Sequence, residues 1–200
     1  MTTGRLETFS DGVFAIAATL LILEVHVREG RESLARGLLH AWPSYTAYAI
    51  SFLTIGIIWV NHHTVFEQIG RVDRTFLFIN VAFLMLVAFI PFPTKLVSEH
   101  LRHEGGRAAA VAYGLTLTGT AILYSVLWFY AALGRRLLRE DADRKTVEGI
   151  SRSYLPGPYV YAAATAAAFV NATVSVALYG AIALFYVLES SLFGRSGRTD

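Results

Sequence analysis

Long apolar runs separated by short charged connections are the feature that most limits what this sequence can fold into. The first run, from Gly12 to Leu23, contains no charged residue, and several later runs are longer. A helix that crosses the hydrocarbon core of a bilayer needs about 20 mainly apolar residues. Only 16% of the 200 residues are charged, against about a quarter in soluble domains. The sequence therefore predicts an all-α integral membrane protein.

Charged and proline-containing connections divide the runs into six predicted membrane-spanning helices within one domain, residues 1–200. Pro91 and Pro93 are expected to break or end the third helix, because proline cannot continue the helical hydrogen bonding. The connection 134–152 is expected to extend the fourth helix beyond the membrane. The last apolar stretch is too long for one span, so we expect a turn near Asn171. The predicted spans are approximately residues 8–26, 42–64, 75–96, 108–133, 154–171 and 173–189.

The distribution of positive charge predicts the orientation of these spans, because cytoplasmic connections carry an excess of Lys and Arg. With both termini in the cytoplasm, eleven basic residues lie inside and six outside. These residues flank membrane segments, and nothing in their pattern indicates a nucleic-acid surface. The start of the chain does not resemble a cleaved signal peptide, because its apolar run is interrupted early by Asp11 and its strongest positive flank follows it. The inner residues are Arg5, Arg71, Arg74, Arg135, Arg136, Arg139, Arg144, Lys145, Arg152, Arg195 and Arg198, and the outer residues are Arg28, Arg31, Arg36, Lys95, Arg102 and Arg107.

The first predicted helix has two unlike sides. At about 100° per residue, one narrow aliphatic stripe has Thr19 on its shoulder, whereas Asp11 projects to nearly the opposite side. Apolar stripes usually pack in a core, so the stripe is either a packing face or the lining of a pore. The stripe consists of Phe9, Ile16, Leu20, Leu23 and Val27.

Two polar clusters are expected to meet at the cytoplasmic ends of the first two helices. Ionisable groups within spans are costly, and they normally pair or face a water-filled route. Asp11 is therefore expected to pair with Arg5, His62 or His63, either as a lock between the two helices or as an ion contact. The two clusters are Arg5, Ser10 and Asp11 on the first helix and Trp59, Asn61, His62 and His63 on the second.

The sequence offers little for a metal site or for catalysis. His62 and His63 are adjacent on a helix and point about 100° apart, so they are poorly placed to share one ion. The four other histidines are predicted on the opposite side of the membrane, and the chain contains no cysteine. No phosphate-binding loop, nucleophile elbow or H-E-x-x-H motif is present. We therefore expect no structural metal, no organic cofactor and no enzymatic activity.

The segment R-L-E-T-F-S-D-G-V-F-A-I-A, residues 5–17, resembles the first-helix signature R-x-x-x-F-S-D-G-V-F-A-I-A of the transmembrane protein 175 family. This family comprises endosomal and lysosomal potassium channels and their bacterial relatives. The segment W-V-N-H-H-T-V-F, residues 59–66, resembles the end of the family's second helix. A single unit of six spans is similar to the bacterial branch of the family.

The resemblance implies a homotetramer whose first helices line a central cation pore. The matching positions imply that Ile16, Leu20 and Leu23 form a hydrophobic constriction and that Thr19 contributes to ion selectivity. Potassium ions would then pass near Ile16 and Thr19. The resemblance also implies that Arg5, Phe9, Ser10 and Asp11 act with the second-helix histidines to hold the pore helix in position.

These inferences predict a potassium-permeable channel in the bacterial plasma membrane, with the bilayer, other copies of the chain and monovalent cations as its partners. Rings of aliphatic side chains gate pores by narrowing and dewetting. A hydroxyl ring should discriminate less than stacked carbonyl rings, so we expect moderate selectivity for K⁺ over Na⁺. The alternative is a proton-coupled secondary transporter that uses Asp11 with His62 and His63. A further alternative is a membrane scaffold in which the aliphatic stripe only packs.

Overall fold

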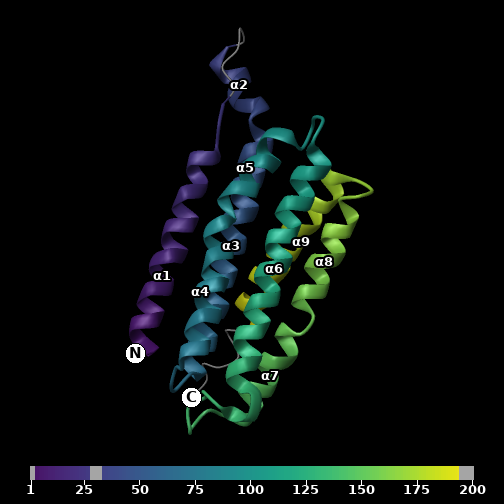
Figure 1. Ribbon diagram of the computed structural model, residues 1–200. Helices are drawn as coiled ribbons and strands as arrows, with labels where there is room; N and C mark the ends of the chain where they lie inside the picture. The colour runs from purple at the N-terminus through teal and green to yellow at the C-terminus, as the bar shows by residue number, and fades with distance from the viewer. Residues whose placement is uncertain (1–2, 28–32, 194–200) are drawn as a thin grey trace.

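The chain folds into a bundle of helices that run up and down roughly parallel to one another (Figure 1). The computed structural model describes residues 3–27 and 33–193. The flanking arginines Arg28, Arg31, Arg195 and Arg198 of the predicted charge pattern lie outside the described residues. The described helices are α1 (Thr3–Leu20), η1 (Leu21–Glu24), α2 (Leu34–His40), α3 (Trp42–Gln68), α4 (Arg74–Phe89), α5 (Pro91–His100), α6 (Gly106–Ala132), η2 (Leu133–Arg135), α7 (Arg144–Tyr154), α8 (Gly157–Ala167) and α9 (Ala172–Phe193).

Four helical runs are long and apolar enough to cross a membrane. They are Thr3–Glu24, Trp42–Gln68, Arg74–His100 and Gly106–Arg135, and a shorter apolar helix covers Ala172–Leu188. At 1.5 Å per residue, the 11 residues of α8 rise only about 16 Å, about half of a bilayer core.

The predicted third helix is broken and then resumes. α4 ends at Phe89 and α5 begins at Pro91, which takes a first-turn position where its missing N–H is tolerated. The amide of Ile90 donates to the Val87 carbonyl at 3.1 Å, so that carbonyl keeps a partner beside the proline. The run then continues to His100, beyond the expected end at residue 96.

The connection 134–152 does not extend the fourth helix, so that expectation is wrong. Gly134 (φ 60°) and Arg135 (φ 56°) both adopt left-handed backbone conformations and turn the chain away from the axis of α6. A separate helix, α7, then begins after Asp143, whose side chain accepts the Thr146 amide at 2.9 Å. This is a helix N-cap, in which a carboxylate satisfies a free amide of the first turn.

The turn expected near Asn171 lies at residues 168–171, between α8 and α9. The side chain of Asn171 accepts the Val174 amide at 3.1 Å, so an N-cap marks the start of α9 where no glycine or proline does. α8 packs closely on α6, where Ala164 and Ala168 are buried. A side chain at Gly114 of α6 would overlap Tyr179 of α9 and Thr165 of α8. Small residues therefore set the close approach of these helices.

Two connections at one end of the bundle pair with each other. The α3–α4 connection and the η2–α7 connection form an antiparallel bridge between Ile69 and Leu138, both of which are buried. The Gly70 amide donates to the Leu137 carbonyl at 2.9 Å. We call this pairing, residues 68–71 with 137–139, the loop clasp.

Candidate functional site

α1 lies at one edge of the bundle and packs on α3 and α4 (Figure 1). Positions spaced three or four apart face these neighbours, as helical periodicity requires. The predicted aliphatic stripe lies on the exposed side of α1 and η1: Ile16 is 61% exposed, Leu20 42%, and Leu23 of η1 64%. The buried positions are Leu6, Ser10, Phe14, Ala17 and Leu21.

A chain of buried hydrogen bonds joins α1, α3 and α4. His62 Nε2 lies 3.1 Å from Asn80 Oδ1, and Asn80 Nδ2 donates to Ser10 Oγ at 3.0 Å. Ser10 in turn donates to the Leu6 carbonyl at 2.9 Å. Because the amide oxygen of Asn80 only accepts, His62 must donate from Nε2. Every link in this chain therefore has a defined direction.

Aromatic rings enclose the imidazole of His62. Phe66 stacks on it with ring centroids 4.3 Å apart, and Phe83 lies parallel to it at 5.8 Å. Phe14 of α1 meets it edge-on at 5.3 Å. His62 is 1% exposed. The contacts hold it as a packing and hydrogen-bonding centre between three helices, without access to solvent in the single chain.

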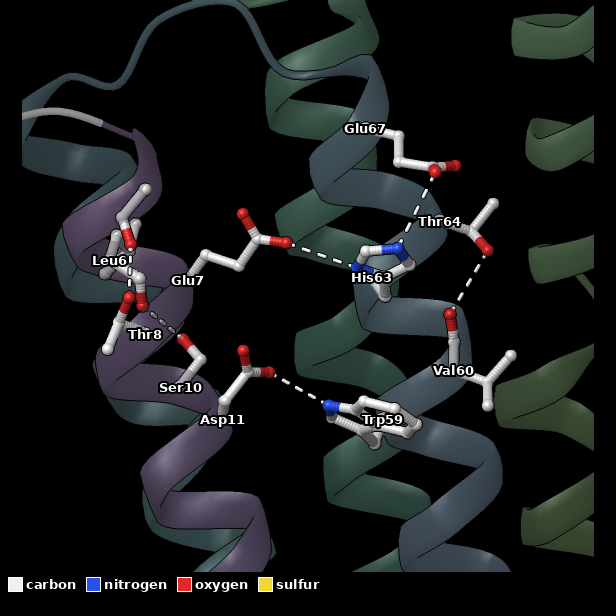
Figure 2. A network of polar contacts seen from close by, with 11 residues as sticks. Leu6, Glu7, Thr8, Ser10, Asp11, Trp59, Val60, His63, Thr64 and Glu67 are labelled. Atoms are coloured by element: carbon white, nitrogen blue, oxygen red, sulfur yellow. Dashed lines mark hydrogen bonds and ion pairs between the residues drawn. The ribbon is translucent and has the colours of Figure 1, made fainter.

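The partner of Asp11 differs from the expectation. Its carboxylate accepts a hydrogen bond from Trp59 Nε1 at 2.9 Å (Figure 2). Of the expected partners, His62 instead bonds Asn80, and Arg5 is exposed. Among the described contacts, the hydrogen-bond donor to Asp11 is therefore the neutral indole of Trp59, where an arginine or histidine was expected. A bond from α1 to α3 is what a lock between the two helices requires.

His63 forms a second link between the same helices. Its Nδ1 lies 3.2 Å from Glu7 on α1, and its Nε2 lies 3.6 Å from Glu67 one turn along α3 (Figure 2). The side chain of His63 is 57% exposed. Exposed ion pairs of this kind contribute little to stability, about 0–1 kcal/mol.

The structure thus brings together Ser10, Asp11, Trp59, His62 and His63 from the predicted polar network. Phe9 is 54% exposed, and the backbone contact of Asn61 lies outside this network, since its carbonyl accepts from Tyr154 of α7 at 3.4 Å. Sequence reasoning missed Asn80 and Glu7. Asn80 could have been found as the lone amide within the apolar run of the third helix, since polar groups within spans normally have partners.

Thr19 carries its hydroxyl on the unpartnered side of α1. The hydroxyl lies 2.9 Å from the Ala15 carbonyl and 3.0 Å from the Ile16 carbonyl of its own helix. Since these contacts use its proton, its oxygen lone pairs remain available to accept from water or to coordinate a cation.

A large open groove lies beside the lock between α1 and α3. Its volume is about 1060 Å³, and its walls come from α1, α3, α7 and α9. Most of its lining is apolar, and its polar side chains include Asp11, Trp59 and Asn61. Residues that line it include Phe52, Leu53, Ile57, Val60 and Tyr186.

Within residues 3–27 and 33–193, no group of three or more His, Asp or Glu side chains is arranged to hold a metal ion. The arrangement provides an exposed aliphatic face on α1 and a polar network that fixes the rotation of that helix against α3 and α4.

Comparisons with known proteins point to one family. The sequence pattern of a family described as "Endosomal/lysosomal potassium channel TMEM175" matches residues 5–91. Over 193 residues the chain is 43% identical to a protein of Chamaesiphon minutus named a potassium channel, covering 94% of this chain and 95% of that protein. A crystal structure of a lysosomal potassium-selective channel TMEM175 homolog from Chamaesiphon minutus matches with a TM-score of 0.86 and 41% identity, covering 94% of this chain and 97% of that chain.

A more distant relative carries a different functional name. A Gallus gallus protein named endosomal/lysosomal proton channel TMEM175 is 34% identical over 143 residues. The match covers 66% of this chain but 28% of that protein.

Proposed function

Because the chain is a bacterial member of the TMEM175 family, we propose that it forms a potassium-permeable cation channel in the bacterial plasma membrane. The proposed molecule is an integral membrane protein with six spans per subunit and both termini in the cytoplasm. Four copies assemble around a central pore lined by α1.

The observation that carries this proposal is the unpartnered aliphatic face of α1. Ile16, Leu20 and Leu23 are exposed although α1 buries its other apolar side against α3 and α4. In a fourfold assembly, each of these residues contributes one member of a ring around the axis. Rings of aliphatic side chains form constrictions that close by dewetting. The open groove beside α1 supports assembly, since it offers an apolar surface to a neighbouring subunit.

Thr19 is proposed as an ion contact beside the constriction. Its oxygen lone pairs face the same unpartnered side, and a ring of four hydroxyls replaces only part of the hydration shell of an ion. We therefore expect moderate selectivity for K⁺ over Na⁺. Bi-ionic reversal potentials that show strong K⁺ selectivity would contradict this assignment.

The proposed function is tested by ion flux through purified protein in liposomes. Wild type is compared with Ile16→Asn and with the control Ile122→Asn, which makes the same change on an exposed face of α6 (47% exposed). A polar ring at the constriction retains water, so Ile16→Asn should raise K⁺ flux or change ion preference, whereas Ile122→Asn should match wild type.

Silence of correctly assembled wild type and Ile16→Asn toward K⁺, Na⁺ and Cs⁺ would refute the pore. The alternative function is proton-coupled transport through Asp11, His62 and His63. Uptake that saturates and depends on a proton gradient would establish that alternative.

A further inference from the structure

The loop clasp encloses a small pocket whose charged walls play no part in the proposed pore. The pocket has a volume of about 440 Å³ and lies where the α3–α4 and η2–α7 connections pair. Three of its lining residues are arginines, and one is an acid. The lining consists of Gly70, Arg71, Arg135, Leu138, Arg139 and Glu140.

Two of these arginines are held in place by neutral groups. Arg71 Nε donates to the Arg136 carbonyl at 2.9 Å, and Arg135 Nη2 donates to the Ala142 carbonyl at 2.6 Å. A guanidinium has five N–H donors, so each side chain is anchored through one and keeps the others. Because carbonyl oxygens carry no net charge, these bonds orient the two cations without neutralising them.

The third arginine is different. Arg139 binds Asp141 with two hydrogen bonds, at 3.0 and 3.1 Å, and its charge is matched there. Among the described residues, the pocket therefore combines two oriented guanidinium groups without an ion-pair partner, Arg71 and Arg135, with one neutralised pair. Guanidinium groups bind oxyanions bidentately and are the usual choice for recognising phosphate.

The backbone of the clasp fixes this geometry. Arg135 has a positive φ of 56°, an uncommon conformation for a residue with a side chain, directly after Gly134. A Cβ on Gly70 would lie 3.0 Å from the Cα of Arg139, so a larger residue there would push the two connections apart by a few tenths of an ångström. The arginines therefore project from a rigid pairing of two backbones.

The pocket lies at the end of two membrane-spanning helices. α3 ends at Gln68 and α4 begins at Arg74, and both belong to apolar runs long enough to cross a bilayer. A residue within a few positions of a span end lies at the depth of the lipid headgroups, where phosphates are concentrated. This depth favours a lipid over a soluble phosphate as the source of the ligand.

We propose that the clasp pocket binds the phosphate of an anionic phospholipid headgroup through Arg71 and Arg135. The proposal rests on the membrane embedding of the chain and is independent of its conduction. Glu140 opposes binding, because it places a negative charge in the wall of an anion site. Substitution of Glu140 should therefore strengthen binding, an effect that damage to the fold would not produce.

The test measures lipid binding directly, by native mass spectrometry of the assembled protein in neutral detergent titrated with phosphatidylglycerol. The pocket variant is Arg71→Gln with Arg135→Gln. The control is Arg74→Gln with Lys145→Gln, which removes the same amount of charge from the same end of the helix bundle and changes no residue that lines the pocket. Arg71→Lys with Arg135→Lys keeps the charge but loses the planar fork. Glu140→Gln completes the set.

We expect the pocket variant to weaken phosphatidylglycerol binding by at least about tenfold, the lysine variant to weaken it less, and the control to change it by less than about twofold. Glu140→Gln should tighten binding, and added salt should weaken it. If the Gln pair fails to assemble, the proposal is tested by the weaker binding expected of the Lys pair and the tighter binding expected of Glu140→Gln.

Equal losses of phosphatidylglycerol affinity in the pocket and control variants would overturn the proposal, since they would show that binding depends on overall surface charge. Absence of saturable binding to wild type would also overturn it, whatever the flux assay shows. Displacement of the lipid by an equal concentration of glycerol 3-phosphate would refute the proposal that the ligand is a lipid, because a soluble phosphate would bind equally well. Loss of lipid binding without a change in K⁺ flux would leave the channel intact and support a separate lipid site.

Discussion

Replacement of Asn80 by alanine tests whether the buried hydrogen-bond chain holds α1 in position. Asn80 is fully buried and accepts from His62 while donating to Ser10, so it connects α4 with both α3 and α1. Alanine removes both bonds and leaves the Nε2–H of His62 without its acceptor. Ser10 keeps its bond to the Leu6 carbonyl.

The expected loss of stability is about 2 kcal/mol. Hydrogen bonds between membrane helices contribute about 0.6 kcal/mol on average and at most about 1.7, and two are lost here. A buried donor left unpaired adds a penalty of about 1–3 kcal/mol in proteins generally. The lower end applies if water or a shifted side chain reaches His62. A loss of 2 kcal/mol corresponds to about a 30-fold shift in the unfolding equilibrium.

The measurement is reversible unfolding in mixed detergent micelles, with helix content as the signal. Asn61→Ala is the matched control, because it makes the same change on α3 while the Asn61 carbonyl keeps its bond from Tyr154. If Asn80→Ala and Asn61→Ala differ by less than about 0.5 kcal/mol, the buried chain does not stabilise the bundle. The same Asn80 variant should also alter K⁺ flux, since α1 loses one of its fixed contacts.

Three further predictions follow from single contacts. Trp59→Phe removes the hydrogen bond to Asp11, so it should lower the free energy of unfolding by less than about 1 kcal/mol and change the ion flux. Asp11→Asn should change the ion flux as well if the carboxylate itself is needed. Flux equal to wild type in Trp59→Phe would refute the lock. The amide of Phe76, foremost among several groups, lowers the pKa of Asp73. The stability that the Asp73 carboxylate contributes is therefore present above about pH 4 and is lost as the pH falls through the lowered value. The melting temperature should vary less between pH 3 and 7 in Asp73→Asn than in wild type, and an equal pH dependence would contradict this. Gly114→Leu places a side chain where α8 and α9 already lie, so it should abolish the assembled form in size-exclusion chromatography, whereas normal assembly would show that these helices can separate at little cost.

The helices themselves follow closely from the sequence. The predicted second helix begins at residue 42, where α3 begins, and the predicted fourth begins two residues after the start of α6 at Gly106. These boundaries are predictable because charged or proline-containing segments cannot continue an apolar span. The break near Pro91 was predicted for the same local reason, the missing N–H of proline.

The rotation of each helix was harder to predict. α1 is apolar on most of its surface, so hydrophobicity alone does not distinguish the side that packs on α3 from the side that stays exposed. Phe14 is 3% exposed and Ile16 is 61% exposed, although both are large and apolar. Periodicity defined the stripe that contains Ile16 but left open whether it packs or lines a pore, and the resemblance in the first-helix signature favoured the pore.

Contacts between residues far apart in the sequence could not be predicted from local sequence patterns. Asn80 and Ser10 are 70 residues apart, and their contact depends on how three helices pack. The role of Gly134 in turning the chain depends on the neighbouring clasp, so a run rich in helix-forming residues was expected to stay helical. The N-cap Asp143 was a local signal that could have corrected this expectation.

The loop clasp also sets an order for biosynthesis. The Arg139 amide donates to the Gln68 carbonyl at 2.9 Å. The last carbonyl of α3 therefore receives its partner from a residue that is synthesised 71 positions later. At about 5–20 residues per second, this interval is roughly 4–14 s of translation. During that time the Gln68 carbonyl lacks this partner. Completion of this end of the bundle therefore waits for the fourth long helix to be synthesised, and the first half of the chain is not finished as an independent unit.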